Sequence, residues 1–104
     1  VTAYSDIKLK ENIEVIGNAV EKVQKIRGVT FTRNDQKDKD KKYAGVIAQE
    51  VEKVLPEVVD YNEETDTKTV AYGNIVGLLI EAIKEQQQTI EKLTRRLDDI
   101  EKGE

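Results

Sequence analysis

The stretch "VGLLIEAIKEQQQTIEKLTRRLDDI", residues 76 to 100, decides the fold. Its apolar residues recur at alternating spacings of three and four, which is the heptad pattern of a coiled coil. We assign Val76, Ile83, Ile90 and Leu97 to the a positions, and Leu79, Gln86, Leu93 and Ile100 to the d positions. A small globular core cannot bury so narrow an apolar seam along one helix, so the pattern predicts partner helices from further copies of the chain.

The seam residues by themselves leave the number of copies open. Leu at d beside β-branched a residues favours dimers, whereas Leu97 at a and Ile100 at d favour three or more strands. Gln86 is either a buried polar layer that sets the register or a polar residue tolerated near solvent. Ile80 and Ala82 widen the apolar stripe, which predicts that the start of the helix also packs on a globular part.

The residues before this helix predict a small α+β body. Apolar spacing predicts a short helix within the stretch 18–28, with Asn18 as its N-cap and Gly28 just past its end. The later elements are expected to be a strand at 29–33, an exposed polar loop at 34–42, a strand at 44–48, a helix at 49–55 stopped by Pro56, and a hairpin with strands at 58–61 and 67–72.

Composition limits the kind of protein this is. A chain of 104 residues with 38% hydrophobic and 37% charged residues is either a disordered solvated chain or an elongated assembly with a shared apolar seam. The heptad periodicity favours the assembly. The net charge of -4 and the interleaving of lysines with acids give no basic face, which argues against a nucleic-acid partner.

Missing residue types narrow the possible chemistry. The sequence has no Cys, His or Met, which excludes disulfides, thiolate nucleophiles, imidazole bases and the usual zinc sites. Asp35, Asp38 and Asp40 lack the glycine and terminal glutamate of a calcium loop, so we expect no metal and no cofactor. No stretch is long and apolar enough for a membrane span, and a start at Val1 indicates that the chain begins inside a longer polypeptide.

The amino-terminal stretch "SDIKLKENI", residues 5 to 13, places a serine and a lysine five positions apart. On an α-helix such a pair is roughly 140° apart around the axis, and on a strand it points to opposite faces. Ser5 and Lys10 can act together only if the backbone between them turns out of regular structure. Otherwise Ser5 and Asp6 cap a helix and Lys10 is a solvated side chain.

Three segments together carry a resemblance to a known family. "SDIKLKENI" at the start, "AGVIAQEVEKVLPEVV" in the middle and "VAYGNIVGLLIEAIKEQQQTIEKL" before the end stand in the order and spacing of that family. The chain resembles, over nearly its whole length, the intramolecular chaperone auto-processing domain of phage tail spikes, tail fibres and neck appendages. This domain is also called the endosialidase-type chaperone or S74 peptidase domain.

The resemblance implies a site and a reaction. Domains of this kind trimerise, help the preceding fibre or spike to fold, and then cut themselves off just before the serine. Carried onto this sequence, Ser5 is the nucleophile, Lys10 is the base and Tyr4–Ser5 is the scissile bond. The family usually has arginine where Lys8 stands, so a cation is kept. A lysine base has to be neutral, and burial or a neighbouring cation favours that state.

Three polar residues are candidates for supporting the pair, and the partners follow from the resemblance. Asp6 is a candidate for orienting Lys10 or shaping its turn, and Gln49 and Glu50 are candidates for holding the loop that carries Ser5. We expect residues 1–4 to end the upstream fibre, 5–72 to form the globular auto-processing part, and 73–104 to form the trimeric coiled coil. The homotrimer and the attached fibre are the expected partners, without nucleic acid or membrane.

Location and host protein are expectations of the same kind. The resemblance implies action in the host cytoplasm during phage assembly and release from the virion after cleavage. A similar domain occurs in a membrane-tethered eukaryotic transcription factor, so the host protein stays open. The alternative function is a structural trimerisation module of a fibrous protein with an inert serine and lysine.

Overall fold

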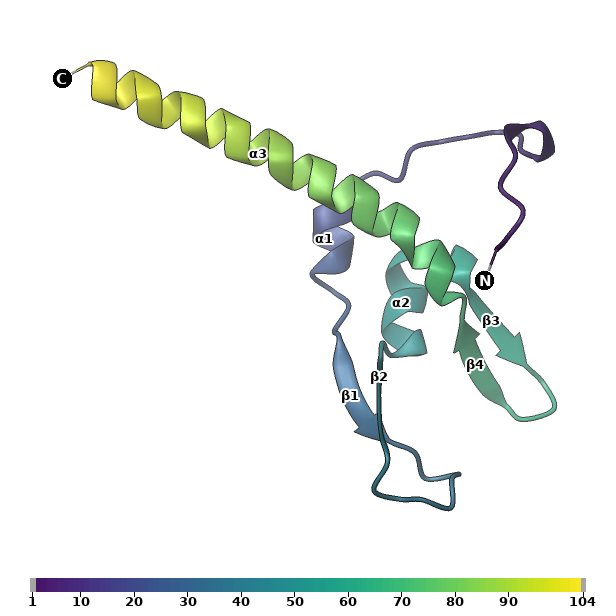
Figure 1. The fold of residues 1–104 in the computed structure, drawn as a ribbon. Helices are drawn as coiled ribbons and strands as arrows, with labels where there is room; N and C mark the ends of the chain where they lie inside the picture. The colour runs from purple at the N-terminus through teal and green to yellow at the C-terminus, as the bar shows by residue number, and fades with distance from the viewer. Residues whose placement is uncertain (1, 104) are drawn as a thin grey trace.

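The computed structural model describes residues 2–103, and it has a small body of short elements beside one long helix (Figure 1). The elements are η1 Ile7–Leu9, α1 Ala19–Val23, β1 Val29–Thr32, β2 Lys42–Gly45, α2 Ala48–Val54, η2 Pro56–Val58, β3 Val59–Asn62, β4 Thr67–Val70, η3 Tyr72–Ile75 and α3 Val76–Lys102. The predicted α+β class is therefore confirmed. The extents of 65 × 42 × 25 Å make the chain elongated.

Helix α3 runs for 27 residues and continues well beyond the body (Figure 1). The helix predicted from the heptad pattern is present, and the single chain leaves its seam uncovered. The apolar seam side chains are exposed by 56% at Val76, 44% at Leu79, 65% at Ile83, 56% at Ile90, 55% at Leu93, 55% at Leu97 and 65% at Ile100. Gln86 is exposed as well.

The first turns of α3 pack on the body through a different face. Leu78 is fully buried and Ala82 is 7% exposed, and both belong to the core of the body. The remaining buried core residues are Ala19, Val51, Leu55 and Val58. The predicted packing of the helix start is thus confirmed for Ala82. It is wrong for Ile80, which is 50% exposed, because Ile80 lies about 200° around the axis from Leu78.

Helix α1 forms where a helix was predicted, but it is shorter and has a different cap. Asn18 has a left-handed backbone with φ 51° and makes no side-chain cap hydrogen bond. The carboxylate of Glu85 on α3 accepts hydrogen bonds instead, from the backbone N–H of Ala19 at 2.8 Å and of Val20 at 3.0 Å. The predicted N-cap was therefore wrong, because a residue from the far end of the chain takes its place.

Two antiparallel hairpins hang from the body on the same side of α3 in Figure 1. The predicted β3–β4 hairpin is confirmed, with Val59 opposite Val70. In the other hairpin, Val29 pairs with Gly45 and Thr32 pairs with Lys42. The strand predicted at 44–48 is wrong in its bounds, because the ribbon is open to solvent and accepts polar residues, while Ala48 already begins α2.

A close approach at Gly45 joins the first hairpin to the start of α3. The N–H of Val46 donates a hydrogen bond to the Tyr72 hydroxyl at 3.1 Å, and Tyr72 begins the short helix η3 that leads into α3. A Cβ added at Gly45 would overlap the Tyr72 hydroxyl. Only glycine gives the ring this room, so β2 is held against the root of the long helix.

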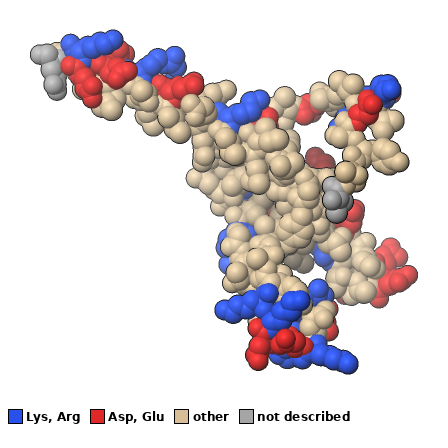
Figure 2. All heavy atoms as spheres, in the orientation of Figure 1, with Lys and Arg blue, Asp and Glu red and all other residues tan. Residues whose placement is uncertain are grey.

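Charge gathers at the ends of the molecule. In Figure 2 lysine, arginine and acidic side chains cluster at the tip of the β1–β2 hairpin and along the outer part of α3, whereas the surface between them is mainly uncharged. Within residues 2–103, no helix has the length and apolar character needed to cross a membrane.

Candidate functional site

Ser5 and Lys10 stand at the two ends of a single 3-10 turn. The turn η1 is closed by two backbone hydrogen bonds, from Leu9 N–H to the Asp6 carbonyl at 3.0 Å and from Lys10 N–H to the Ile7 carbonyl at 3.1 Å. At Lys10 the backbone becomes extended, with φ -119° and ψ 140°. The departure from regular structure that this spacing requires is therefore present.

This turn brings the serine and lysine side chains together. Lys10 Nζ donates a hydrogen bond to Ser5 Oγ at 2.9 Å, which lies within the reach expected of a base and the hydroxyl it activates. A protonated ammonium can only donate, whereas a neutral amine at the same distance can take the hydroxyl proton. Both residues are exposed in the single chain, so the arrangement has the right geometry but open surroundings.

Asp6 shapes the turn. Its Oδ1 accepts a hydrogen bond from the Lys8 backbone N–H at 2.9 Å, which makes it the cap of η1. Its Oδ2 lies 4.0 Å from Lys8 Nζ. Of the two roles considered for Asp6, the structure supports shaping the turn, and it directs the carboxylate to Lys8 and not to Lys10.

The other two candidate supports lie on α2, and their contacts point elsewhere. Gln49 is exposed. The Glu50 carboxylate accepts three hydrogen bonds from Arg27: from Nη2 at 2.6 Å, from Nε at 2.9 Å and from the backbone N–H at 3.1 Å. The hydrogen bond from the Arg27 side chain lowers the pKa of Glu50. Glu50 thus ties α2 to the link between α1 and β1, and these contacts do not reach Ser5.

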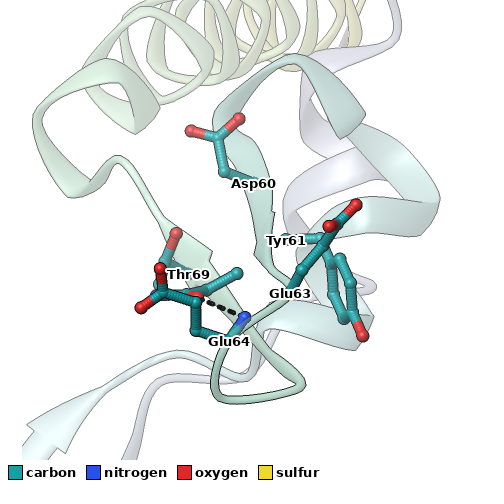
Figure 3. A pocket seen from close by; sticks show the side chains of 6 residues that line it. Asp60, Tyr61, Glu63, Glu64 and Thr69 are labelled. Atoms are coloured by element: carbon teal, nitrogen blue, oxygen red, sulfur yellow. Dashed lines mark hydrogen bonds between the residues drawn. The ribbon is translucent and has the colours of Figure 1, made fainter.

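A second place with polar side chains is the tip of the β3–β4 hairpin (Figure 3). A hollow of about 510 Å³ is lined there by Asp60, Tyr61, Asn62, Glu63, Glu64 and Thr69. The turn is held by a hydrogen bond from the Glu64 N–H to the Asn62 side chain at 3.0 Å. Among residues 2–103 no group of three or more ligands is placed to hold a metal ion, and this hollow pairs no lysine base with a hydroxyl. The Ser5–Lys10 pair remains the better candidate.

A comparison with protein families identifies the chain. The Peptidase S74 family model, described as chaperone of endosialidase, matches residues 5–60. The chain belongs to this family. The match begins at Ser5, includes Lys10 and α2, and ends at Asp60 within β3.

The similar curated proteins are phage tail-fibre proteins. Long tail fiber protein Gp37 of Enterobacteria phage K3 is 34% identical over 98 residues, which cover 89% of this chain and 8% of that protein. The Gp37 proteins of Enterobacteria phages T2 and M1 are 34% and 37% identical, over 89% and 86% of this chain. The chain spans 7% of the T2 protein and 38% of the M1 protein, so it corresponds to less than half of each.

The sequence interpretation missed one feature beside the site. Residues 7–15, which we call the N-terminal strap, place four large aliphatic side chains in solvent: Ile7, Leu9, Ile13 and Val15. The available signal was the alternation of Ile13 and Val15 with polar neighbours, which is typical of an extended segment with one apolar face.

Proposed function

We propose that this chain is an intramolecular chaperone that trimerises through α3, assists the folding of a phage fibre attached to its amino terminus, and releases itself by cutting Tyr4–Ser5. Membership of the chaperone-of-endosialidase family supports the chaperone role. Similarity to Gp37 long tail fibre proteins supports a fibre as the client. The exposed a/d residues of α3 support assembly through that helix.

The observation that carries the cleavage proposal is the 2.9 Å contact between Lys10 Nζ and Ser5 Oγ in a chain of this family. Neutral Lys10 takes the Ser5 hydroxyl proton, and Oγ attacks the carbonyl carbon of Tyr4. The Tyr4–Ser5 C–N bond breaks as the amine of Ser5 is protonated, which leaves Tyr4 attached to Ser5 through an ester. Water hydrolyses this ester, giving a Tyr4 carboxylate and a chain that begins with Ser5.

We assign a separate role to each of three parts of the chain, and the first part ends at the proposed cut. Residues 1–4 end the fibre, and of these Val1 lies outside the described residues. Residues 5–72 hold the site, and the segment 73–104, of which Glu104 lies outside the described residues, supplies the assembly helix α3. Cleavage takes place in the host cytoplasm during assembly, so that the released domain is absent from the finished virion.

The test uses a precursor that carries fibre sequence upstream of residue 1. We expect a fragment whose amino terminus is Ser5, read by mass spectrometry. Ser5→Ala should abolish the cut, and Lys10→Ala should slow it by about 10²–10⁴-fold, which is the usual contribution of a general base. Lys10→Arg should be as slow, because an arginine stays protonated, and the wild-type rate should rise with pH.

Lys37→Ala is the matched control, because Lys37 is an exposed lysine in the β1–β2 loop. It should cut at the wild-type rate, and all variants should keep the wild-type number of copies per assembly in sedimentation equilibrium. Undiminished cutting in Lys10→Ala would remove the lysine from the mechanism. A new amino terminus at any other residue would move the scissile bond.

A structural trimerisation module without cleavage is the second candidate. It is favoured by the exposure of both Ser5 and Lys10 in the single chain, because a solvated lysine is a poor base at neutral pH. A wild-type precursor that is trimeric and stays uncut across the pH range would support this candidate against the first.

A further inference from the structure

The proposed cut changes the chemistry of Ser5 itself. The scissile bond precedes Ser5, so this residue becomes the first of the released chain, and its backbone nitrogen changes from an amide into a free α-amine. The released chain also keeps Lys10, whose Nζ lies 2.9 Å from Ser5 Oγ. The α-amine stands on the carbon next to the one that bears Oγ, so the hydroxyl then lies beside two amines.

The turn that holds the pair does not depend on the residues that the cut removes. The backbone and capping hydrogen bonds of η1 all lie within residues 6–10. Residues 2–4 belong to no helix or strand, and the Tyr4 side chain is 96% exposed. We therefore expect the chain that begins at Ser5 to keep the turn and the contact with Lys10.

The new α-amine is a better base near neutral pH than a solvated lysine. An α-amino group has an ordinary pKa of about 7.7–8.0, against about 10.4 for a lysine side chain, so a much larger fraction of it is neutral there. Amino-terminal amines activate hydroxyl nucleophiles in this way in other enzymes. A protonated lysine at 2.9 Å from Oγ complements the amine, because its hydrogen bond stabilises the negative charge that grows on the oxygen.

The cut also opens room in front of Ser5 Oγ. In the proposed reaction Oγ attacks the carbonyl carbon of Tyr4, and Tyr4 then leaves with the fibre. Water has to reach the same place to hydrolyse the ester, so a small molecule no bulkier than the departed residue fits there as well. Ile7 and Leu9 on the same turn are 72% and 69% exposed, and they favour an acyl donor with a short apolar chain.

We propose that the released chain is an acyl acceptor, whose Ser5 takes the acyl group of a small ester in trans. The inference rests on the proposed function for its free amino terminus. The α-amine takes the proton of the Ser5 hydroxyl, and Oγ attacks the carbonyl carbon of the ester. The C–O bond of the ester breaks, and the alcohol leaves with that proton.

The acyl group then moves within Ser5. The neutral α-amine attacks the new ester, the bond between Oγ and the acyl carbon breaks, and a proton from the amine restores the hydroxyl. The result is an amide on the nitrogen of Ser5, the same kind of bond as Tyr4–Ser5 in the uncut chain. Under the proposed function neutral Lys10 removes this group as it removes Tyr4, so the two reactions together make the chain an esterase.

The reaction of p-nitrophenyl acetate with the chain of residues 5–104 tests this activity. The chain is prepared by removing an amino-terminal tag with an added protease, so its free amino terminus does not depend on its own cut. Release of p-nitrophenol should be at least about ten-fold faster than from the Ser5→Ala version, and the rate should rise with pH around a midpoint of about 7.7–8.0. Equal rates in the two chains overturn the proposal, because the exposed amines alone then account for the reaction.

The variant Lys10→Arg separates the roles of the two amines. In the chain of residues 5–104 it should keep the initial release of p-nitrophenol within about three-fold of the wild type, because arginine still donates a hydrogen bond to Oγ. It should also hold an acetyl group on the nitrogen of Ser5, found by mass spectrometry, because arginine cannot be the base that removes it. The control Lys37→Ala should match the wild type in both measurements. A Lys10→Arg chain as slow as the Ser5→Ala version overturns the proposal, since the lysine is then the base.

The precursor distinguishes this proposal from the proposed function. A precursor that cuts at Ser5, beside a chain of residues 5–104 that reacts no faster than its Ser5→Ala version, overturns the acyl acceptor and leaves the proposed function standing. A precursor that stays uncut, beside a prepared chain that takes the acetyl group on Ser5, supports the acyl acceptor and removes the self-cleavage.

Discussion

The near and far parts of α3 carry one heptad seam but have different surroundings. In the near half, residues 76–85, Leu78 and Ala82 enter the core, and Glu85 caps α1. In the far half, residues 86–102, every side chain is exposed. The heptad seam runs through both halves without a break. One helix therefore carries two contact surfaces, one for its own chain and one for other copies.

Helical geometry keeps the two surfaces apart. Leu78, Ala82 and Glu85 follow one another at spacings of four and three, which places them on one face. The seam positions are centred roughly 90–100° further around the axis, given about 100° per residue. The body can thus stay docked while partner helices pack along the seam, and a substitution can remove one contact while the other remains.

The largest effect, a loss of assembly, is expected when charged residues are placed in the far half of the seam. Leu93→Asp with Leu97→Asp should dissociate the assembly, because an uncompensated buried charge costs about 3–5 kcal/mol. Sedimentation equilibrium should then give the monomer mass, while circular dichroism still shows a cooperative transition of the body. The control Lys92→Asp with Arg95→Asp places the same side chains outside the seam, at c and f, and should leave the mass unchanged. A fully unfolded seam variant would mean that the body has no stability without its copies.

A smaller effect, a loss of folding stability, is expected when a core side chain is shortened in the near half. Leu78→Ala should destabilise the chain by about 2–5 kcal/mol, because it opens a cavity in the core. Denaturant unfolding in the Leu93→Asp, Leu97→Asp background measures this without a contribution from assembly. Ile80→Ala is the matched control two residues away, and its cost should stay within about 0.5 kcal/mol, as at ordinary surface positions. Similar costs at both positions would contradict the separation of the two surfaces.

The smallest effect on stability is expected from the titration of Glu85. Hydrogen bonds from the N–H groups of Val20 and Ala19 lower the pKa of Glu85. A lowered folded-state pKa gives stability that is present above the ordinary glutamate value of about 4.3 and is lost as the pH falls through the lowered value. Glu85→Gln should therefore melt below the wild type at pH 7, and the difference in Tm should shrink as the pH falls below about 4.3.

Glu91→Gln is the control for this titration, because Glu91 is an exposed glutamate in the far half of the same helix. Its melting temperature should follow the wild type across the pH range. A gap between Glu85→Gln and the wild type that stayed constant from pH 7 to about pH 3 would show that the carboxylate charge is not the source of the stabilisation.

Features that depend on neighbouring residues could be predicted from the sequence. The seam of α3 follows from a periodicity held over more than three heptads, and the β3–β4 hairpin follows from two β-prone runs around an acidic turn. The sequence also predicted that the backbone must turn between Ser5 and Lys10 if the two side chains are to meet. No regular backbone brings side chains five residues apart together.

Features that depend on residues far apart in the sequence could not be predicted from it. Asparagine often caps helices, so Asn18 fits an N-cap by residue type. In the structure the carboxylate of Glu85, from the other end of the chain, accepts hydrogen bonds from the first amides of α1 instead. Ile80 and Leu78 are equally apolar, and only the position of the body decides which of them is buried. Glu50 stands in a segment typical of the family, yet its partner Arg27 is no local neighbour.

The cap on α1 also affects how early the domain can fold while the chain is being synthesised. Glu85 stands 66 residues after Ala19, and the ribosome makes a chain from its amino terminus. When α1 emerges, the groups that complete it have not yet been synthesised, and the Leu78 side chain that closes the core is missing as well. Contacts so far apart in sequence form late. Under the proposed function, the whole fibre would be translated before its chaperone domain could close, so a prematurely terminated fibre would never obtain a working one.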